Sequence, residues 1–159
     1  MIAAALMAAW LAGCGGSSHQ ATSTSTPVPT GPPVSKSIYQ ARAVGVLRPM
    51  LGAINTALRT PRQPVVWQQL QRSAADAYQT IGKLSPPPAI SEPDRQLVRQ
   101  LGDVASTAGA LYQTLRSGNL SGAAPLGHRL INEGHQITSL GNQLKAQGYN
   151  QVGTILAGP

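Results

Sequence analysis

Four stretches of the chain carry apolar residues at every third or fourth position, which is the spacing of one face of an α-helix. No stretch alternates apolar and polar residues with the period of two that a strand would show. An amphipathic helix cannot bury its apolar face alone, so the pattern predicts an all-α fold, an antiparallel up-down-up-down four-helix bundle. The expected buried positions are Val44, Leu47, Leu51, Ile54 and Leu58; Trp67, Leu70, Ala74, Ala77, Ile81 and Leu84; Leu97, Leu101, Val104, Ala108, Leu111 and Leu115; and Leu126, Leu130, Ile137, Leu140 and Leu144.

Turn residues separate the first three of these helices. Thr60 and Pro61 divide the first helix from the second. The run 85–88, a serine and three prolines, ends the second helix, because proline lacks an amide donor and restricts the residue before it. Ser91 is the expected N-cap of the third helix, with Asp94 at the capping-box position.

The boundaries of the last helix follow from the same signals. Gly118 ends the third helix, and either Asn119 or Ser121 caps the fourth. The fourth helix stops at a glycine, so the bundle is expected to cover residues 37–148. Residues 149–159 are then expected to form a weakly structured C-terminal tail.

The N-terminus has a different character. Apolar residues run from Ile2 up to the motif Leu11-Ala12-Gly13-Cys14, which contains the only cysteine of the chain. The run is shorter than the roughly 20 residues that span a bilayer, and it matches the apolar region of a secretory leader. The motif resembles the lipobox of bacterial lipoproteins, although this leader begins without Lys or Arg. The alternative is a buried N-terminal helix in which the cysteine is an ordinary core residue.

The lipobox resemblance implies where the protein resides. Residues 1–13 would be a signal peptide, and Cys14 would carry a thioether-linked diacylglycerol with palmitate-type chains. Two acyl chains, at about 0.8 kcal/mol per buried CH₂, hold a protein to a membrane essentially permanently. The expected location is therefore the extracytoplasmic side of the cell membrane.

Residues 14–36 follow the leader and are rich in Ser, Thr and Pro. Such a segment has little to bury and is expected to be a flexible stalk, either a plain spacer or an O-glycosylated one. The order of stalk, helices and proline-rich link also resembles, loosely, small uncharacterised envelope lipoproteins of high-GC Gram-positive bacteria. That resemblance implies no activity.

Two irregularities interrupt the helices. Pro49 lies inside the first helix, four residues after Gly45, and should kink it. Such a kink either opens a cavity or only adjusts packing. Glycines also recur every seven residues along the fourth helix, which indicates close approach of another backbone, either within the molecule or from a second copy. They are Gly127, Gly134, Gly141 and Gly148.

Glu133 is the one charged residue on an expected apolar face. A carboxylate there must pair with a cation or a hydrogen-bond donor, or take up a proton, and Tyr78 and Tyr112 are the expected donors. It is either a polar residue that fixes the register of the bundle or a ligand-contacting group in an internal pocket, together with Trp67.

No catalytic or metal-binding motif is recognised. His128 and His135 are two helical turns apart, about 10 Å, and cannot share one metal ion as an i, i+4 pair can. They are expected to be solvated surface residues. The sequence therefore predicts no enzyme activity, no cofactor and no metal site.

Charge is the remaining functional signal. Lys and Arg outnumber Asp and Glu by 12 to 5, and the excess lies in the first half of the chain. Residues 15–90 contain seven cations and only one anion, Asp76. A basic surface on an envelope protein indicates anionic polymers or lipid headgroups as partners, whereas export disfavours nucleic acid. The seven are Lys36, Arg42, Arg48, Arg59, Arg62, Arg72 and Lys83.

Three functions remain open from the sequence. The favoured one is a non-enzymatic, lipid-anchored interaction or scaffold module that contacts anionic polymers or another envelope protein. The second is a carrier of a small hydrophobic ligand or lipid, with a cavity near Pro49, Trp67 and Glu133. The third is an enzyme that brings Glu133, Tyr112 and a histidine together in a polar cleft.

Overall fold

The computed structural model describes residues 27–158. The leader, Cys14 and the first part of the stalk lie outside the described residues. The described chain folds into five α-helices with a short 3₁₀ turn, η1, and contains no strand, which confirms the all-α prediction. In chain order the elements are α1 (Lys36–Arg59), α2 (Pro64–Gly82), η1 (Pro88–Ile90), α3 (Ser91–Arg116), α4 (Leu120–Ala146) and α5 (Asn150–Ala157).

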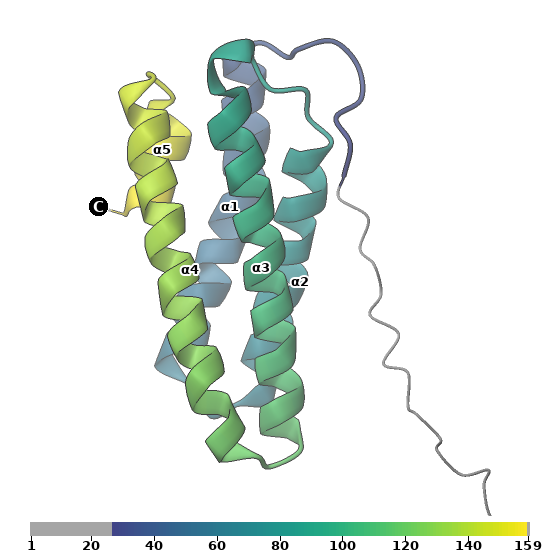
Figure 1. The fold of residues 1–159 in the computed structure, drawn as a ribbon, viewed down its shortest axis with the longest axis vertical. Helices are drawn as coiled ribbons and strands as arrows, with labels where there is room; N and C mark the ends of the chain where they lie inside the picture. The colour runs from purple at the N-terminus through teal and green to yellow at the C-terminus, as the bar shows by residue number, and fades with distance from the viewer. Residues whose placement is uncertain (1–26, 159) are drawn as a thin grey trace, which may run out of the picture.

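The helices pack in chain order around one core. α1 packs on α2, α2 on α3 and α3 on α4, while the short α5 packs against both α4 and α1 (Figure 1). Trp67, Leu70 and Ile81 of α2 and Leu97 and Leu101 of α3 are buried, as the apolar spacing predicted. The buried core residues therefore come from all five α-helices, and α5 packs against both α4 and α1.

The α1 face differs from the expected one. Of the predicted stripe only Leu47 is buried, whereas Leu58 is 61 % exposed. Val44 and Ile54 pack at the edge of the core, and Leu51 is half-buried. Alanines let neighbouring backbones approach closely, so the helix turns its small residues inward and leaves larger ones at the margin. The buried residues of α1 are Tyr39, Ala43, Leu47, Met50, Ala53 and Ala57.

The expected C-terminal tail is a helix. Gly148 ends α4 with φ of +83°, a left-handed conformation that glycine adopts without strain. The chain then turns back, and Tyr149, Val152 and Leu156 become buried. These three positions have helical spacing, but eight residues gave too short a pattern for a sequence prediction.

The last part of the predicted stalk is also ordered. We call residues 27–35 the strap. The Val34 amide donates to the Ser85 carbonyl at 2.9 Å, and the Ser85 hydroxyl donates to the Gly31 carbonyl at 2.7 Å. The Thr30 amide donates to the Lys83 carbonyl at 3.3 Å. The flexible stalk expected over 14–36 is therefore wrong for residues 27–35, because these bonds tie the strap to the α2–α3 link.

The helix N-caps agree only in part with those expected from the sequence. Of the two residues expected to cap α4, Asn119 does so, because its Oδ1 accepts the Gly122 amide at 3.0 Å. The expected Ser91 cap is absent, since Ile90 precedes α3 and no side chain caps its start. The predicted capping-box residue, Asp94, turns into the core instead. α1 continues through Pro49, which lies on its exposed side.

Candidate functional site

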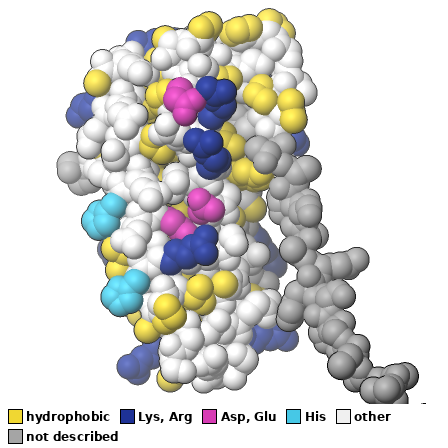
Figure 2. Space-filling view, in the orientation of Figure 1, with side chains coloured by type: hydrophobic (Ala, Val, Ile, Leu, Met, Phe, Trp, Pro, Cys, Tyr) yellow, Lys and Arg dark blue, Asp and Glu magenta, His cyan; other side chains and the backbone are white. Residues whose placement is uncertain are grey.

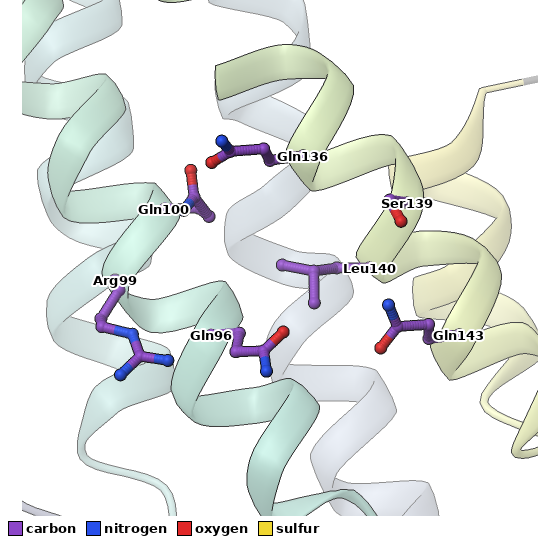
Figure 3. Close-up of a pocket in the computed structure, with 7 residues that line it drawn as sticks. All are labelled: Gln96, Arg99, Gln100, Gln136, Ser139, Leu140 and Gln143. Carbon is purple, nitrogen blue, oxygen red and sulfur yellow. The ribbon is translucent and has the colours of Figure 1, made fainter. Parts of the chain in front are cut away.

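A polar pocket lies between α3 and α4, and we call it the amide groove. It has a volume of about 300 Å³, and four of its seven lining residues are glutamines (Figure 3). The lining residues are Gln96, Arg99 and Gln100 from α3, and Gln136, Ser139, Leu140 and Gln143 from α4. Sequence reasoning missed this site, although Gln96 with Gln100 and Gln136 with Gln143 have spacings that place each pair on one helix face.

The glutamines meet across the groove. Figure 3 shows Gln100 and Gln136 pointing toward one another from the two helices, with Leu140 directed into the space below them. Gln96 is held from its own helix, because its Nε2 donates to Oε1 of Glu92 at 3.0 Å. The side-chain oxygen of Gln100 is buried and has no hydrogen-bond partner.

Ion pairs border the groove on the α3 side. Glu92 pairs with Arg95, and its other oxygen lies 3.9 Å from Arg99. Hydrogen bonds from Gln96 and then Arg95 lower the pKa of the Glu92 carboxyl. Figure 2 shows acidic and basic side chains side by side in two groups on this face of the molecule. The Arg99 charge is thus partly balanced where the groove begins.

The second charged group surrounds Glu133. Its Oε1 accepts from the Thr107 hydroxyl at 2.7 Å and from Arg129 Nε at 2.9 Å, and Arg129 also reaches Asp103 at 3.9 Å. Glu133 is only 5 % exposed, and its second oxygen has no partner. Glu133 therefore has both a hydroxyl donor and a cation as partners.

The expected donors to Glu133 are wrong. Tyr112 accepts a hydrogen bond from Arg116 at 3.3 Å, and the Tyr78 ring lies next to Gly102 of α3. The sequence spacing placed both tyrosines at the edges of neighbouring apolar stripes. It gave no reason to prefer Thr107 as the donor to Glu133, because Thr107 is a small polar residue of the α3 stripe.

A buried acid was missed by the sequence. Asp94 is 3 % exposed, and its Oδ1 accepts from the Tyr39 hydroxyl at 2.6 Å. Burial raises the pKa of Asp94 to about 6, although the Tyr39 hydrogen bond acts in the opposite direction. The Tyr39 ring meets Tyr149 edge-on at 5.8 Å between centroids, and Lys36 Nζ lies 5.0 Å from the Tyr149 ring centroid. These contacts join α1, α3 and the start of α5.

The seven cations of the first half of the chain stay exposed. All seven lie on the surface, and within residues 27–158 none forms an ion pair. Two of them, Arg42 and Lys83, line a second pocket of about 330 Å³ under the strap, which we call the basic pocket. Its other lining residues are Thr30, Val34, Thr80, Leu84 and Ser85.

The remaining candidate residues do not meet. Trp67 is buried and donates from Nε1 to the Pro61 carbonyl at 2.8 Å, whereas Pro49 is exposed. His128 and His135 are both exposed, as expected. No group of three metal-ligating side chains occurs in the described part of the chain.

Two further comparisons concern membrane-spanning helices and similarity to known proteins. Among residues 27–158 no helix is both long and apolar enough to cross a bilayer. No protein-family model, curated protein or solved structure matches the chain.

Proposed function

We propose that this protein is a non-enzymatic lipoprotein of the cell envelope, anchored through Cys14, whose helical domain contacts anionic polymers. The motif Leu11-Ala12-Gly13-Cys14 supports the anchor and the extracytoplasmic location. The chain after Cys14, up to the strap, is the proposed tether. The alternation of long helices with short links supports an antiparallel up-down arrangement for α1 to α4, to which α5 is added.

The observation that carries the contact with polyanions is the exposed, unpaired set of seven cations. A cation that has no carboxylate partner keeps its full attraction for an external anion. The basic pocket adds a concave part to this surface, where Arg42 and Lys83 lie together with the hydroxyls of Thr30, Thr80 and Ser85. Such a set of donors fits a phosphate or carboxylate group.

The positions of the acidic residues support a role without catalysis. Asp94 is bound to Tyr39, and Glu133 is bound to Thr107 and Arg129. Tyr112 is bound to Arg116, so Glu133 and Tyr112, two members of the enzyme hypothesis, have separate partners. The carrier hypothesis gains no support either, because Pro49 is exposed and Trp67 and Glu133 are engaged elsewhere.

Binding of the full chain, in detergent micelles, to soluble polyphosphate tests the polyanion contact. Arg42→Glu should weaken binding roughly thirtyfold, because it removes one favourable charge and adds one unfavourable charge at about 1 kcal/mol each. Fluorescence anisotropy of labelled polyphosphate at low salt measures the affinity, and binding should weaken as salt rises.

Arg116→Glu is the matched control. Arg116 is also an exposed helical arginine, but it lies at the end of α3, outside the seven cations. Both variants have the same net charge. Equal losses for the two variants would contradict a localised anion-binding surface, as would affinity independent of salt.

A further inference from the structure

The amide groove has the chemistry of a binding site that neither the anchor nor the basic surface explains. Each glutamine side chain offers one carbonyl acceptor and two N–H donors. Gln96 and Gln100 present these groups from α3, and Gln136 and Gln143 present them from α4 (Figure 3). The groove therefore offers both donors and acceptors on both walls.

The four glutamine amides form no hydrogen bonds with one another. Of the four, Gln96 is bonded to Glu92 of its own helix, and the carbonyl oxygen of Gln100 is buried without a partner. A buried acceptor without a donor carries the full cost of losing its water. An external N–H group that reached Gln100 would remove that cost.

The lining excludes several ligand classes. Arg99 is the only cation that lines the groove, and Glu92 lies 3.9 Å from it, so a polyanion is poorly matched. Leu140 is the only apolar side chain in the lining, too little for a lipid chain. No aromatic ring lines the groove to receive the apolar face of a sugar ring.

A peptide main chain matches the lining in chemistry and in length. Its N–H and C=O groups alternate, and side-chain amides pair with both. Gln136 and Gln143 are seven residues apart, so they span about 10 Å along α4. Three extended residues cover the same distance, at about 3.3–3.6 Å each.

We propose that the amide groove binds the main chain of an extended peptide segment about three residues long. Gln100 Oε1 accepts a peptide N–H, and the amides of Gln136 and Gln143 hydrogen-bond the following groups along the segment. Recognition through the main chain makes the site tolerant of the peptide's side chains. This proposal does not depend on lipidation or on the basic surface.

The test follows the side-chain amide signals of the full ¹⁵N-labelled chain, in detergent micelles, by nuclear magnetic resonance. The probe is acetyl-trialanine amide, titrated to roughly 10 mM because a few hydrogen bonds support a Kd near 1 mM. The signals of Gln96, Gln100, Gln136 and Gln143 should shift saturably. The signal of Gln113, an exposed residue of α3 outside the groove, should not.

Two further probes identify what is recognised. The same peptide with methylated main-chain nitrogens lacks the N–H donors and should leave all four signals unchanged. Maltotriose, which offers hydroxyls instead of amides, should also leave them unchanged. No shift with acetyl-trialanine amide, or equal shifts with either of the other probes, would overturn the proposal.

A pair of variants separates binding from folding. Gln100→Leu keeps the size of the side chain but removes the unpartnered acceptor, and it should weaken peptide binding about fivefold. Gln113→Leu makes the same chemical change outside the groove and should leave the affinity unchanged. Equal affinities of the two variants would also overturn the proposal, provided that both retain the native spectrum.

Discussion

At the scale of single residues, the fold holds two buried carboxylates in different ways. Glu133 has a cation and a hydroxyl as partners, whereas Asp94 has only the Tyr39 hydroxyl. Burial without a cation explains why the pKa of Asp94 is raised to about 6 from 3.8. The two sites therefore call for different tests, pH for Asp94 and substitution of the uncharged donor for Glu133.

The raised pKa of Asp94 makes stability depend on pH. The native chain holds a proton between pH 3.8 and about 6 that the unfolded chain has lost, so stability is highest below this window and falls as the pH rises through it. The loss amounts to roughly 3 kcal/mol in the free energy of unfolding. Asp94→Asn keeps an acceptor for the Tyr39 hydroxyl but has no carboxyl group to titrate, so this loss of stability should be absent.

Urea unfolding of both chains from acid to neutral pH measures this difference. Glu92, whose pKa is lowered, contributes in the opposite sense, but it is present in both chains and cancels in the comparison. A difference between wild type and Asp94→Asn that stays constant from pH 4 to 7 would contradict the assigned pKa shift.

Thr107 is the uncharged donor to Glu133, which makes it a second test at this scale. Thr107→Val preserves shape but leaves the buried carboxylate with Arg129 alone, so the free energy of unfolding should fall by about 1–3 kcal/mol. Thr154→Val, at an exposed position of α5, is the control and should change stability little. Equal effects of the two substitutions would show that the Thr107 hydrogen bond contributes nothing.

Individual side chains were harder to predict than helices. Glu133 stood out because a charge occupied an apolar stripe, and it has both a hydroxyl donor and a cation as partners. Asp94 was interpreted as a capping residue, because an acid in a first turn after a serine fits both a cap and a core position. The partners of either residue come from other helices, which spacing along one helix cannot reveal.

At the scale of elements, the glycines of α4 explain how α5 docks. A Cβ on Gly141 would lie 2.7 Å from the Ala157 nitrogen, and one on Gly153 would lie 2.7 Å from the Gly141 carbonyl oxygen. Around Gly127 and Gly134, by contrast, nothing lies within 4 Å of such an atom. Close packing inside the molecule thus accounts for Gly141 but not for the two earlier glycines.

Alanine at Gly141 and at Gly134 should therefore have opposite effects. Gly141→Ala would force α5 away from α4 and should cost about 1–3 kcal/mol, with faster hydrogen exchange in residues 150–157. Gly134→Ala, one heptad earlier, should stabilise α4 by up to about 1 kcal/mol. If both substitutions stabilise the chain, the close α4–α5 contact is wrong.

The predicted elements were correct where the pattern was long and regular. α2 buries five of the six residues expected of it, and the sixth, Leu84, is buried just beyond its end, whereas α1 turns another face inward. Both faces of α1 have apolar residues at steps of three and four, so the sequence could not choose between them. α5 and the strap were missed because each depends on contacts with distant parts of the chain rather than on a long pattern of its own.

At the scale of the whole molecule, charge and polarity divide the surface. The seven cations without an ion pair in the first half of the chain lie on α1, α2 and the links beside them, whereas every ion pair among residues 27–158 and the amide groove belong to α3 and α4. This division supports two separate contacts for one helical domain, one with an anionic polymer and one with a peptide. Neither use requires catalysis.

Metabolic labelling with an alkyne fatty acid tests the central claim, attachment through Cys14, most directly. We expect the full chain, expressed in bacteria, to carry the label in the membrane fraction, and its intact mass to lack residues 1–13 and to include the acyl groups. Cys14→Ala should carry no label. A wild-type chain that is unlabelled, keeps its first 13 residues and is recovered from the soluble fraction would contradict a lipid-anchored envelope protein.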